Sequence, residues 1–283
     1  MSTQQITQEL RQWIIAQAAA GQAPEVVLKS MLGSGWNEDV AVAALEDTLN
    51  GFLAGHAQAN GLPPPLVVPE PVLAAGAVAL QAGDREVQVL ATLRGPRVVV
   101  FGGLLSHDEC DGMVELARTR LTRSETVQLD TGGNEINTAR TSDGMFFARE
   151  ENPLCTRIET RIAALLNWPL ENGEGLQVLR YRPGAEYKPH YDYFDPAQPG
   201  TANILKRGGQ RVASVVMYLN TPARGGGTTF PDVNLEVGPV KGNAVFFSYD
   251  RPHPMTRTLH GGAPVLEGEK WVATKWLREG RFE

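Results

Sequence analysis

The chain has 283 residues, and 26 lysine and arginine residues stand against 32 aspartate and glutamate residues, which gives a formal charge of −6. This length suits about two average domains, or one large domain with an appendage. A mildly acidic chain without a basic patch does not fit a nucleic-acid-binding protein. Residues 1–80 hold two basic and seven acidic groups and so carry −5 of the net charge. The chain therefore divides into an acidic first part and a nearly neutral second part.

The first 58 residues have a helical pattern. Ile6, Leu10 and Ile14 recur at the spacing of one helix face. A second short helix follows, and Asn37 is a good N-cap for a third helix that is expected to end near Gly51. Residues 1–58 are therefore predicted to form a small three-helix module. It is expected to dock a partner or to dimerise, and the alternative is a merely structural appendage.

A proline-rich segment follows the predicted helices. The prolines of Pro63-Pro64-Pro65 and Pro69-Glu70-Pro71 favour an extended, semi-rigid linker, which is assigned to residues 59–84. Residues 85–283 are predicted to form one domain, in which Ser106 caps a helix and a second helix spans 152–166. Short apolar runs between glycine turns then predict an all-β sandwich or barrel. The predicted strands are 98–101, 176–181, 212–219, 228–230, a strand at 237, 244–248 and 271–277.

The cellular compartment follows from the cysteines and the apolar runs. Two cysteines, Cys110 and Cys155, are too few for a disulfide framework and form no Cys-x-x-Cys pair. The longest apolar stretch, near 72–80, is too short to span a bilayer. The start of the chain lacks the basic region and apolar run of a secretory signal. A cytoplasmic protein that does not enter the membrane is expected.

The histidines point to a metal site. His190 and Asp192 are two residues apart, and such residues on one strand point to the same face about 6.6 Å apart. A histidine from a distant strand completes the two-histidine, one-carboxylate set that leaves iron positions open for substrate and dioxygen. His260 is the preferred third ligand. His253 is the alternative, although it lies in a turn-prone Arg-Pro-His-Pro sequence.

A lysine ten residues after His260 suggests an anion site beside this metal. If Lys270 points inward, then Val272, Thr274 and Trp276 share its face, whereas Trp271 faces away. A buried ammonium group requires an anionic partner. A dicarboxylate cosubstrate meets that requirement.

Several motifs in a fixed order resemble the prolyl 4-hydroxylases that depend on Fe(II) and 2-oxoglutarate. The run that includes Tyr187-Lys-Pro-His190-Tyr-Asp192-Tyr-Phe carries much of this resemblance. It covers about residues 95–280 and excludes residues 1–80. The remaining motifs occupy residues 140–142, 176–186, 208–211, 217–222, 225–228, 241–247 and 259–276.

The resemblance implies a fold and a site. The fold is α+β but mainly β, with a double-stranded β-helix (jelly-roll) core, supporting helices and the small helical bundle in front. His190, Asp192 and His260 match the iron ligands of the family. Lys270 matches the residue that pairs with the far carboxylate of 2-oxoglutarate, beside Tyr181 and Thr274. The positions that match the peptide-proline groove are Arg140, Ser142, Tyr187, Arg211 and Trp276, with Tyr187 also expected to take part in catalysis.

The implied activity is hydroxylation of a peptidyl proline, at ring position 4, coupled to decarboxylation of 2-oxoglutarate to succinate and CO2. Fe(II), 2-oxoglutarate and dioxygen are required, and ascorbate is the expected reductant. The partner is a proline-containing peptide or protein. The same oxygenase chemistry on another residue or a free small molecule is one alternative. A metal-binding interaction protein with a degenerate oxygenase site is another.

Overall fold

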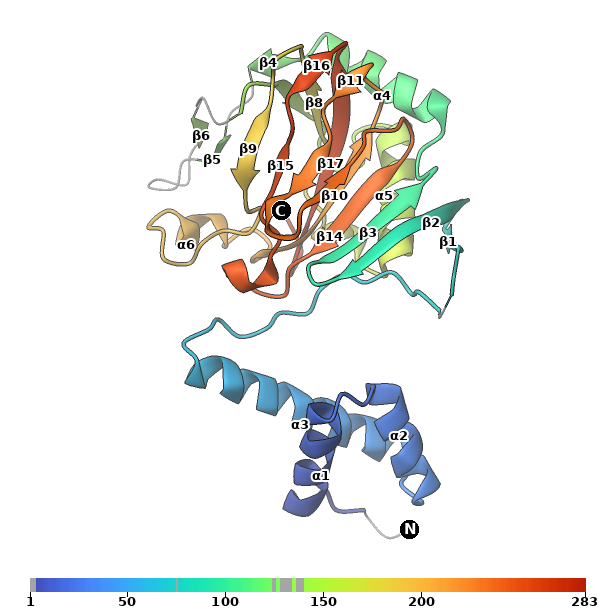
Figure 1. Cartoon of the computed structure of the whole chain (residues 1–283), viewed down its shortest axis with the longest axis vertical. Coiled ribbons are helices and arrows are strands. Elements are labelled where there is room, and N and C mark those ends of the chain that lie inside the picture. The colour runs from blue at the N-terminus through green and yellow to red at the C-terminus, as the bar shows by residue number, and fades with distance from the viewer. Residues whose placement is uncertain (1–3, 75, 124–125, 128–133, 136–139) are drawn as a thin grey trace. The chain divides into compact units, whose positions relative to one another are not determined.

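The computed structural model describes residues 4–74, 76–123, 126–127, 134–135 and 140–283 (Figure 1). The chain divides into two compact units, Met1–Pro65 and Leu66–Glu283. No helix in the described parts of the chain is both long and apolar enough to cross a membrane.

The first unit contains three helices in its described part, α1 (Gln8–Ala19), α2 (Pro24–Gly33) and α3 (Glu38–Ala59). The side chain of Asn37 caps α3 as predicted, accepting a hydrogen bond from the Val40 backbone. The helix continues beyond Gly51, where it was expected to end. A glycine inside a helix costs only about 1 kcal/mol, and the alanines that follow favour the helix. The apolar core of this unit comprises Ile14, Val27, Met31, Ala41, Ala44 and Leu45.

A nine-stranded sheet forms the scaffold of the second unit, and all its described neighbours pair antiparallel. Two continuous apolar runs of the sequence lie here, in β3 and β14, because both faces of these strands are buried. In sheet order, the strands are β1 (Ala79–Ala82), β2 (Arg85–Arg94), β3 (Arg97–Gly102), β14 (Ala244–Ser248), β10 (Arg211–Tyr218), β17 (Lys270–Arg278), β8 (Gln177–Tyr181), β7 (Asp143–Phe146) and β4 (Thr122–Arg123).

A four-stranded sheet lies against this scaffold. Its order is β13 (Leu235–Val237), β12 (Thr228–Phe230), β15 (His260–Gly262) and β9 (Tyr187–His190). Side chains from both sheets form one apolar cluster, in which Phe230 of the small sheet meets Phe247 and Val245 of the large one. Two short pairs complete the strands, β11 (Arg224–Gly225) with β16 (Val265–Glu267) and β5 (Thr126–Val127) with β6 (Asn134–Glu135). The mainly β sandwich with supporting helices confirms the predicted fold class.

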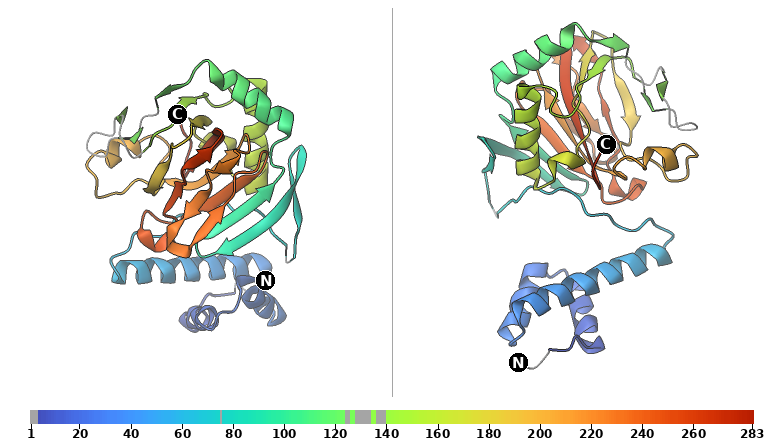
Figure 2. Two further views of the ribbon diagram at one scale, coloured as in Figure 1. Left: turned by 45° about the horizontal axis from the view of Figure 1, so that its top comes forward. Right: turned by 180° about the vertical axis from the view of Figure 1, so that it is seen from behind.

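Two helices cover the other face of the large sheet, as the views in Figure 2 show. They are α4 (His107–Arg118) and α5 (Pro153–Leu166). Ser106 and Glu109 form a reciprocal capping box at the start of α4, and Asn152 caps α5. Both helix starts were predicted. The short helical segments are α6 (Thr201–Ile204), η1 (Leu170–Asn172), η2 (Pro231–Val233) and η3 (Pro254–Thr256).

Part of the predicted linker, residues 59–84, belongs to the second unit. Leu66 N–H donates to the Asp250 carbonyl oxygen at 2.6 Å, and Glu70 N–H donates to the Leu166 carbonyl oxygen at 3.2 Å. Strand β1 then pairs along β2. The assignment of residues 1–58, 59–84 and 85–283 to three functional parts remains a prediction.

Candidate active site

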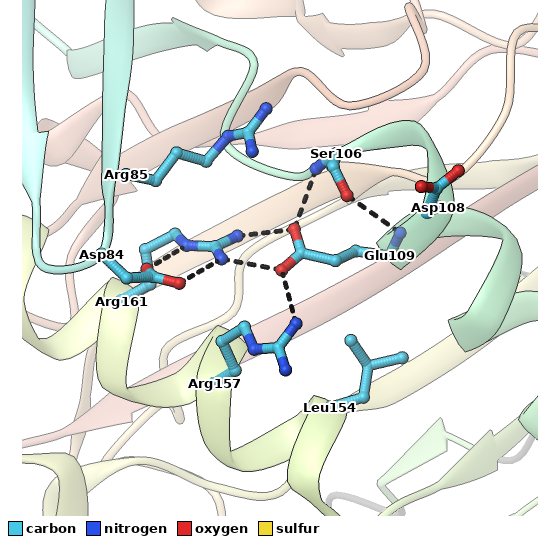
Figure 3. Close-up of a pocket in the computed structure, with 8 residues that line it drawn as sticks. All are labelled: Asp84, Arg85, Ser106, Asp108, Glu109, Leu154, Arg157 and Arg161. Atoms are coloured by element: carbon cyan, nitrogen blue, oxygen red, sulfur yellow. Dashed lines mark hydrogen bonds and ion pairs between the residues drawn. The ribbon is translucent and has the colours of Figure 1, made fainter.

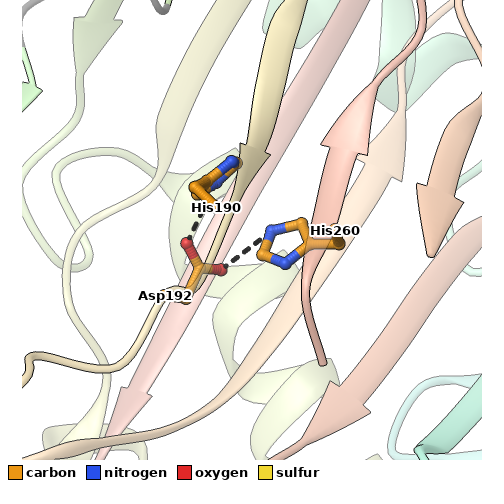
Figure 4. Close-up of side chains that lie close together, drawn as sticks. All are labelled: His190, Asp192 and His260. Atoms are coloured by element: carbon orange, nitrogen blue, oxygen red, sulfur yellow. Dashed lines mark ion pairs between the residues drawn. The ribbon is translucent and has the colours of Figure 1, made fainter. Parts of the chain in front are cut away.

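Two neighbouring strands of the small sheet bring the predicted metal ligands together. His190 ends β9 and His260 begins β15, and the two residues lie opposite each other in the antiparallel pair. Asp192 follows two residues after β9 has ended, so the strand geometry assumed for His190 and Asp192 holds only for the histidine. One ligand atom from each of the three residues lies within 4.8 Å of the others. In Figure 4 the Asp192 carboxylate reaches toward both imidazole rings.

Backbone carbonyl groups orient both rings for metal binding. His190 Nδ1 lies 2.9 Å from the Lys188 carbonyl oxygen, and His260 Nδ1 lies 3.0 Å from the Thr258 carbonyl oxygen. Because a carbonyl oxygen only accepts hydrogen bonds, we assign the ring proton to Nδ1 in both residues. Each Nε2 then presents a lone pair, and each lies 3.5 Å from an oxygen of Asp192. Two imidazole nitrogens and one carboxylate oxygen are a donor set that suits Fe(II).

The charges of these groups also suit a metal ion. Burial lowers the pKa of His260 to about 4, so its imidazole is neutral at pH 7. Burial on its own raises the pKa of Asp192, but the neighbouring His260, His190 and Arg211 outweigh it and hold the pKa below its usual range. The carboxylate is therefore ionised. A neutral imidazole and an ionised carboxylate are the forms that bind metal.

Aromatic rings pack against both histidine ligands. The ring of Tyr187 stacks on His190 with centroids 3.7 Å apart, and the ring of Phe247 lies 4.5 Å from that of His260. Burial raises the pKa of Tyr187 to about 12, so its phenol is neutral. These contacts limit the space around the imidazoles and restrict how far the rings can rotate.

Lys270 provides a buried positive charge at the start of β17, opposite Tyr181 of β8. Its side chain is 3% exposed, and burial lowers its pKa to about 8. Its ammonium group lies 5.4 Å from the ring centre of Tyr181 and 5.8 Å from that of Tyr218. Within the described residues it makes no ion pair. The charge of Glu236 acts on it from a greater distance and raises its pKa against the effect of burial. A buried ammonium without a close carboxylate is the expected state of a site that binds an anion.

The alternation predicted for β17 is confirmed. Val272 belongs to the cluster between the sheets, and Trp271 belongs to the cluster beneath the helices. Lys270 and Thr274 therefore lie on the inner face of the strand, about 13 Å apart along it. Thr274 is buried and pairs with Gln177 of β8. Gly226 contacts the lysine side chain: its φ of +76° favours glycine, and a Cβ there would lie 3.1 Å from Lys270 Cδ.

The residues predicted for the peptide groove form two groups. Arg140 bridges the backbone of Tyr187, its guanidinium lies 4.9 Å from that ring centre, and it donates to Gln177 Oε1 at 2.6 Å. Ser142 follows two residues later and is fully buried.

The second group surrounds Arg211, whose guanidinium lies 3.9 Å from the ring centre of Trp276. Glu174 holds this guanidinium through two bonds, of 2.6 Å from Nε and 2.9 Å from the terminal nitrogen. Sequence reasoning missed Glu174, which is buried between Arg211 and Arg278. An isolated glutamate before an apolar strand gives no signal for this role.

The remaining histidines take other positions. His253 Nδ1 accepts a hydrogen bond from the Met255 backbone at 3.1 Å and caps η3. His107 is the first residue of α4, and His56 lies in the last turn of α3. Of the described residues, His190, Asp192 and His260 form the one group of three that could hold a metal. This favours His260 over His253.

A charged pocket of about 470 Å³ lies at the start of α4, apart from the predicted metal ligands (Figure 3). Most of the charged side chains that line it form ion pairs with one another. Arg161 pairs with Asp84 at 2.8 Å and with Glu109 at 2.7 Å, and Arg157 lies 3.8 Å from Glu109. Arg85 donates to the Gly103 carbonyl oxygen at 2.6 Å. We assign this network to the packing of α4 against α5.

Comparison with known proteins agrees with the geometry. Residues 176–278 match the family described as the 2OG-Fe(II) oxygenase superfamily. Prolyl 4-hydroxylase 1 of Arabidopsis thaliana is 44% identical over 202 residues, which cover 65% of this chain and 69% of that protein. Prolyl 4-hydroxylase 2 of the same plant is 38% identical over 213 residues, 66% of this chain and 69% of that protein. The chain belongs to the prolyl 4-hydroxylase family.

A solved structure of a prolyl hydroxylase shares the fold of this chain. The viral collagen prolyl hydroxylase of Paramecium bursaria Chlorella virus 1, in complex with 2-oxoglutarate, superposes with a TM-score of 0.50 at 30% identity. The match covers 64% of this chain and 95% of the viral one. The chain is thus a 2-oxoglutarate-dependent dioxygenase with a jelly-roll core. It uses Fe(II), 2-oxoglutarate and dioxygen, and ascorbate is typical of its family.

Proposed function

We propose that this enzyme hydroxylates peptidyl proline at ring position 4 and that His190, Asp192 and His260 hold its Fe(II). The observation that carries the proposal is the presence, in the same sandwich, of this donor set and of a buried lysine that has no ion-pair partner within the described residues. Lys270 is the group for the far carboxylate of 2-oxoglutarate, with Tyr181 opposite it on β8 and Thr274 further along the same face of β17. A donor set of this kind on its own is compatible with many metal sites, and a buried lysine on its own is compatible with a site for many anions. Both together suit a metal and a dicarboxylate.

Fe(II) with 2-oxoglutarate supplies the oxidising chemistry, in which dioxygen converts 2-oxoglutarate to succinate and CO2 and hydroxylates a C–H bond. The protein orients and protects these reactants. Thr258 and Lys188 carbonyl groups orient the histidine rings, and the buried rings of Phe230 and Phe247 cover His260. Tyr187 stacks on His190 and lies beside Arg140, so it sits between the ligand set and the proposed groove. We assign to it the orientation of the proline ring.

Arg140, Ser142, Arg211 and Trp276 are proposed to line the groove for the peptide. The Arg211–Trp276 stack is supported by Glu174, which leaves an aromatic and cationic wall in a fixed position. A flat wall of this kind suits a proline ring and the peptide carbonyl groups beside it.

Iron-dependent formation of succinate, stimulated by a proline-containing peptide, tests the proposed function. Peptide stimulation with one added oxygen on proline supports the proposal. Hydroxylation of another residue or of a free small molecule supports the second reading, in which the same chemistry serves another substrate. A chain that binds metal without consuming 2-oxoglutarate supports a degenerate site. Replacing proline by alanine in the same peptide is the matched control.

We also propose that residues 1–58 form a docking or dimerisation module joined by the 59–84 segment to a catalytic domain of residues 85–283. Residues 1–65 carry six acidic and two basic groups, and three helices with their own apolar core support independent folding. Sedimentation of the full chain and of residues 66–283 tests dimerisation. A dimer that survives removal of residues 1–65 contradicts that role.

Cytoplasmic localisation is proposed from the thiols. Cys110 and Cys155 are both free and buried, and burial raises the pKa of each thiol to about 11, so neither is reactive. Unreactive buried thiols suit a reducing compartment. Fractionation of the source cells tests this assignment.

A further inference from the structure

The Asp192 carboxylate has a second set of contacts, which begins at Oδ2, the oxygen that also lies 3.5 Å from His260 Nε2. Ser214 Oγ lies 2.5 Å from Asp192 Oδ2, and the Tyr249 hydroxyl lies 3.0 Å from Ser214 Oγ. Ser214 is in the middle of β10 and is fully buried, and Tyr249 directly follows β14. The register places Ser214 opposite Phe247 of β14 and Trp276 of β17. Three buried groups from three segments thus form one chain of hydrogen bonds.

The direction of these hydrogen bonds is fixed by the number of protons. An ionised carboxylate only accepts, so Ser214 donates its one proton to Asp192. Ser214 therefore has no proton left for Tyr249, and the Tyr249 hydroxyl must donate to Ser214. Burial and the nearby Asp192 charge raise the pKa of Tyr249 well above its usual value, so its hydroxyl keeps the proton that it donates. Hydrogen bonds arranged in sequence strengthen one another.

Packing in β10 does not require a serine at position 214, because apolar side chains surround it in the strand. Its neighbours along β10 are Val212, Ala213 and Val215, all buried and apolar. A buried hydroxyl lowers stability unless it forms hydrogen bonds, and the carboxylate of Asp192 is the acceptor that it uses.

We propose that Ser214 and Tyr249 are positioning residues that occupy Asp192 Oδ2 and leave Oδ1 as the single oxygen for the metal. The proposal rests on the proposed Fe(II) site of His190, Asp192 and His260. Carboxylates bind metals through one oxygen or two, and a partner on the second oxygen favours binding through one. Of six positions around iron, three protein ligand atoms leave three free. Binding through both oxygens would leave only two, which is too few for a bidentate 2-oxoglutarate and dioxygen together.

Titration of the metal-free full chain with Mn(II), followed by electron paramagnetic resonance of the free ion, tests the proposal without turnover. Ser214→Ala should raise the Mn(II) dissociation constant about 10- to 100-fold, as loss of such partners does at other metal sites. Tyr249→Phe removes only the outer hydrogen bond and should raise it roughly five-fold. Ser214→Thr keeps a hydroxyl and should restore most of the affinity.

Ser248→Ala is the matched control, because Ser248 is a buried serine on β14 whose partner in the register is Ala213 rather than Ser214. It should bind Mn(II) as the parent does. Equal dissociation constants for the parent and Ser214→Ala would overturn the proposal. If Ser214→Ala does not fold, an unchanged constant for Tyr249→Phe, which keeps the ring packing, overturns it instead. Failure of the parent itself to bind Mn(II) would refute the proposed metal site and is thereby distinguished from failure of the positioning role.

Discussion

Two buried lysines on β17 differ in one respect, and this difference yields a sharp prediction. Lys270 makes no ion pair within the described residues, whereas Lys275 pairs with Glu159 at 2.5 Å. Both side chains are nearly inaccessible to water. Replacing each with methionine removes the charge and keeps most of the side-chain volume. We expect the two substitutions to have opposite effects on stability and different effects on cosubstrate binding.

The magnitude for Lys270 follows from its pKa. Burial lowers this pKa from the usual 10.5 to about 8, and one pKa unit corresponds to 1.36 kcal/mol, so the charge destabilises the unliganded fold by about 3 kcal/mol at pH 7. Because the folded pKa lies below the unfolded one, this destabilisation is complete below pH 8. It shrinks as the pH rises from about 8 to about 10.5 and is absent above.

Lys270→Met should therefore raise the free energy of unfolding by about 3 kcal/mol at pH 7, with no gain near pH 10.5. The same variant lacks the ammonium group proposed to pair with the far carboxylate of bound 2-oxoglutarate. Such a loss costs about 2–5 kcal/mol, so the KM for 2-oxoglutarate should rise at least about 30-fold. Lys275→Met leaves Glu159 unpaired and should lower the free energy of unfolding by about 3–5 kcal/mol, with the KM unchanged.

Urea unfolding of the metal-free full chain at both pH values measures the stabilities, and succinate formation at varied 2-oxoglutarate concentration measures the KM. A less stable Lys270→Met protein with an unchanged KM would refute the reasoning. It would mean that Lys270 is a structural residue like Lys275.

Three further predictions concern the ligand set, the groove and the first unit. His260→Ala should abolish Mn(II) binding, whereas His253→Ala should bind Mn(II) normally because His253 only caps η3; the reverse result would reassign the third ligand. Arg140→Gln should raise the KM for a proline-containing peptide roughly ten-fold, the effect of losing a charged hydrogen bond. The KM for 2-oxoglutarate should stay unchanged, and succinate release measures both constants. An equal rise in both would contradict a role of Arg140 in the groove. A chain that starts at Leu66 should keep its iron-dependent consumption of 2-oxoglutarate. A chain that starts at residue 85 should unfold at a lower temperature, because it lacks β1 and the Leu66–Asp250 hydrogen bond. Equal melting temperatures for the two truncated chains would contradict this part of the account.

Local patterns sufficed for much of the fold. The capping residues Ser106 and Asn152 mark helix starts because their side chains satisfy free backbone groups, a purely local effect. Strands β3, β8, β10, β14 and β17 were predicted from apolar runs that reflect burial on both faces. Strand β2 was missed. Much of it is exposed, so its residues do not form a continuous apolar run.

The site was predictable where its residues are close in sequence or share a strand face. His190 with Asp192, and Lys270 with Thr274, have this property. His260 was preferred because Lys270 follows it by ten residues, and the resemblance to the family supported it. The contacts of Glu174 with Arg211 and of Ser214 with Asp192 join residues 37 and 22 positions apart. Such pairs depend on the strand order of the large sheet, which a single sequence does not contain. Asp192 also lies beyond the end of β9, because the pairing with β15 stops at His190.

The central claim is that the chain couples 2-oxoglutarate consumption to hydroxylation of a peptidyl proline. Incubation with Fe(II), 2-oxoglutarate, a proline-containing peptide and isotopically labelled dioxygen, followed by mass spectrometry, tests it most directly. The account predicts one labelled oxygen on proline, identified as 4-hydroxyproline, and one succinate for each hydroxylated peptide. Succinate formation with no oxygen on the peptide, or with the oxygen on a residue other than proline, would contradict it.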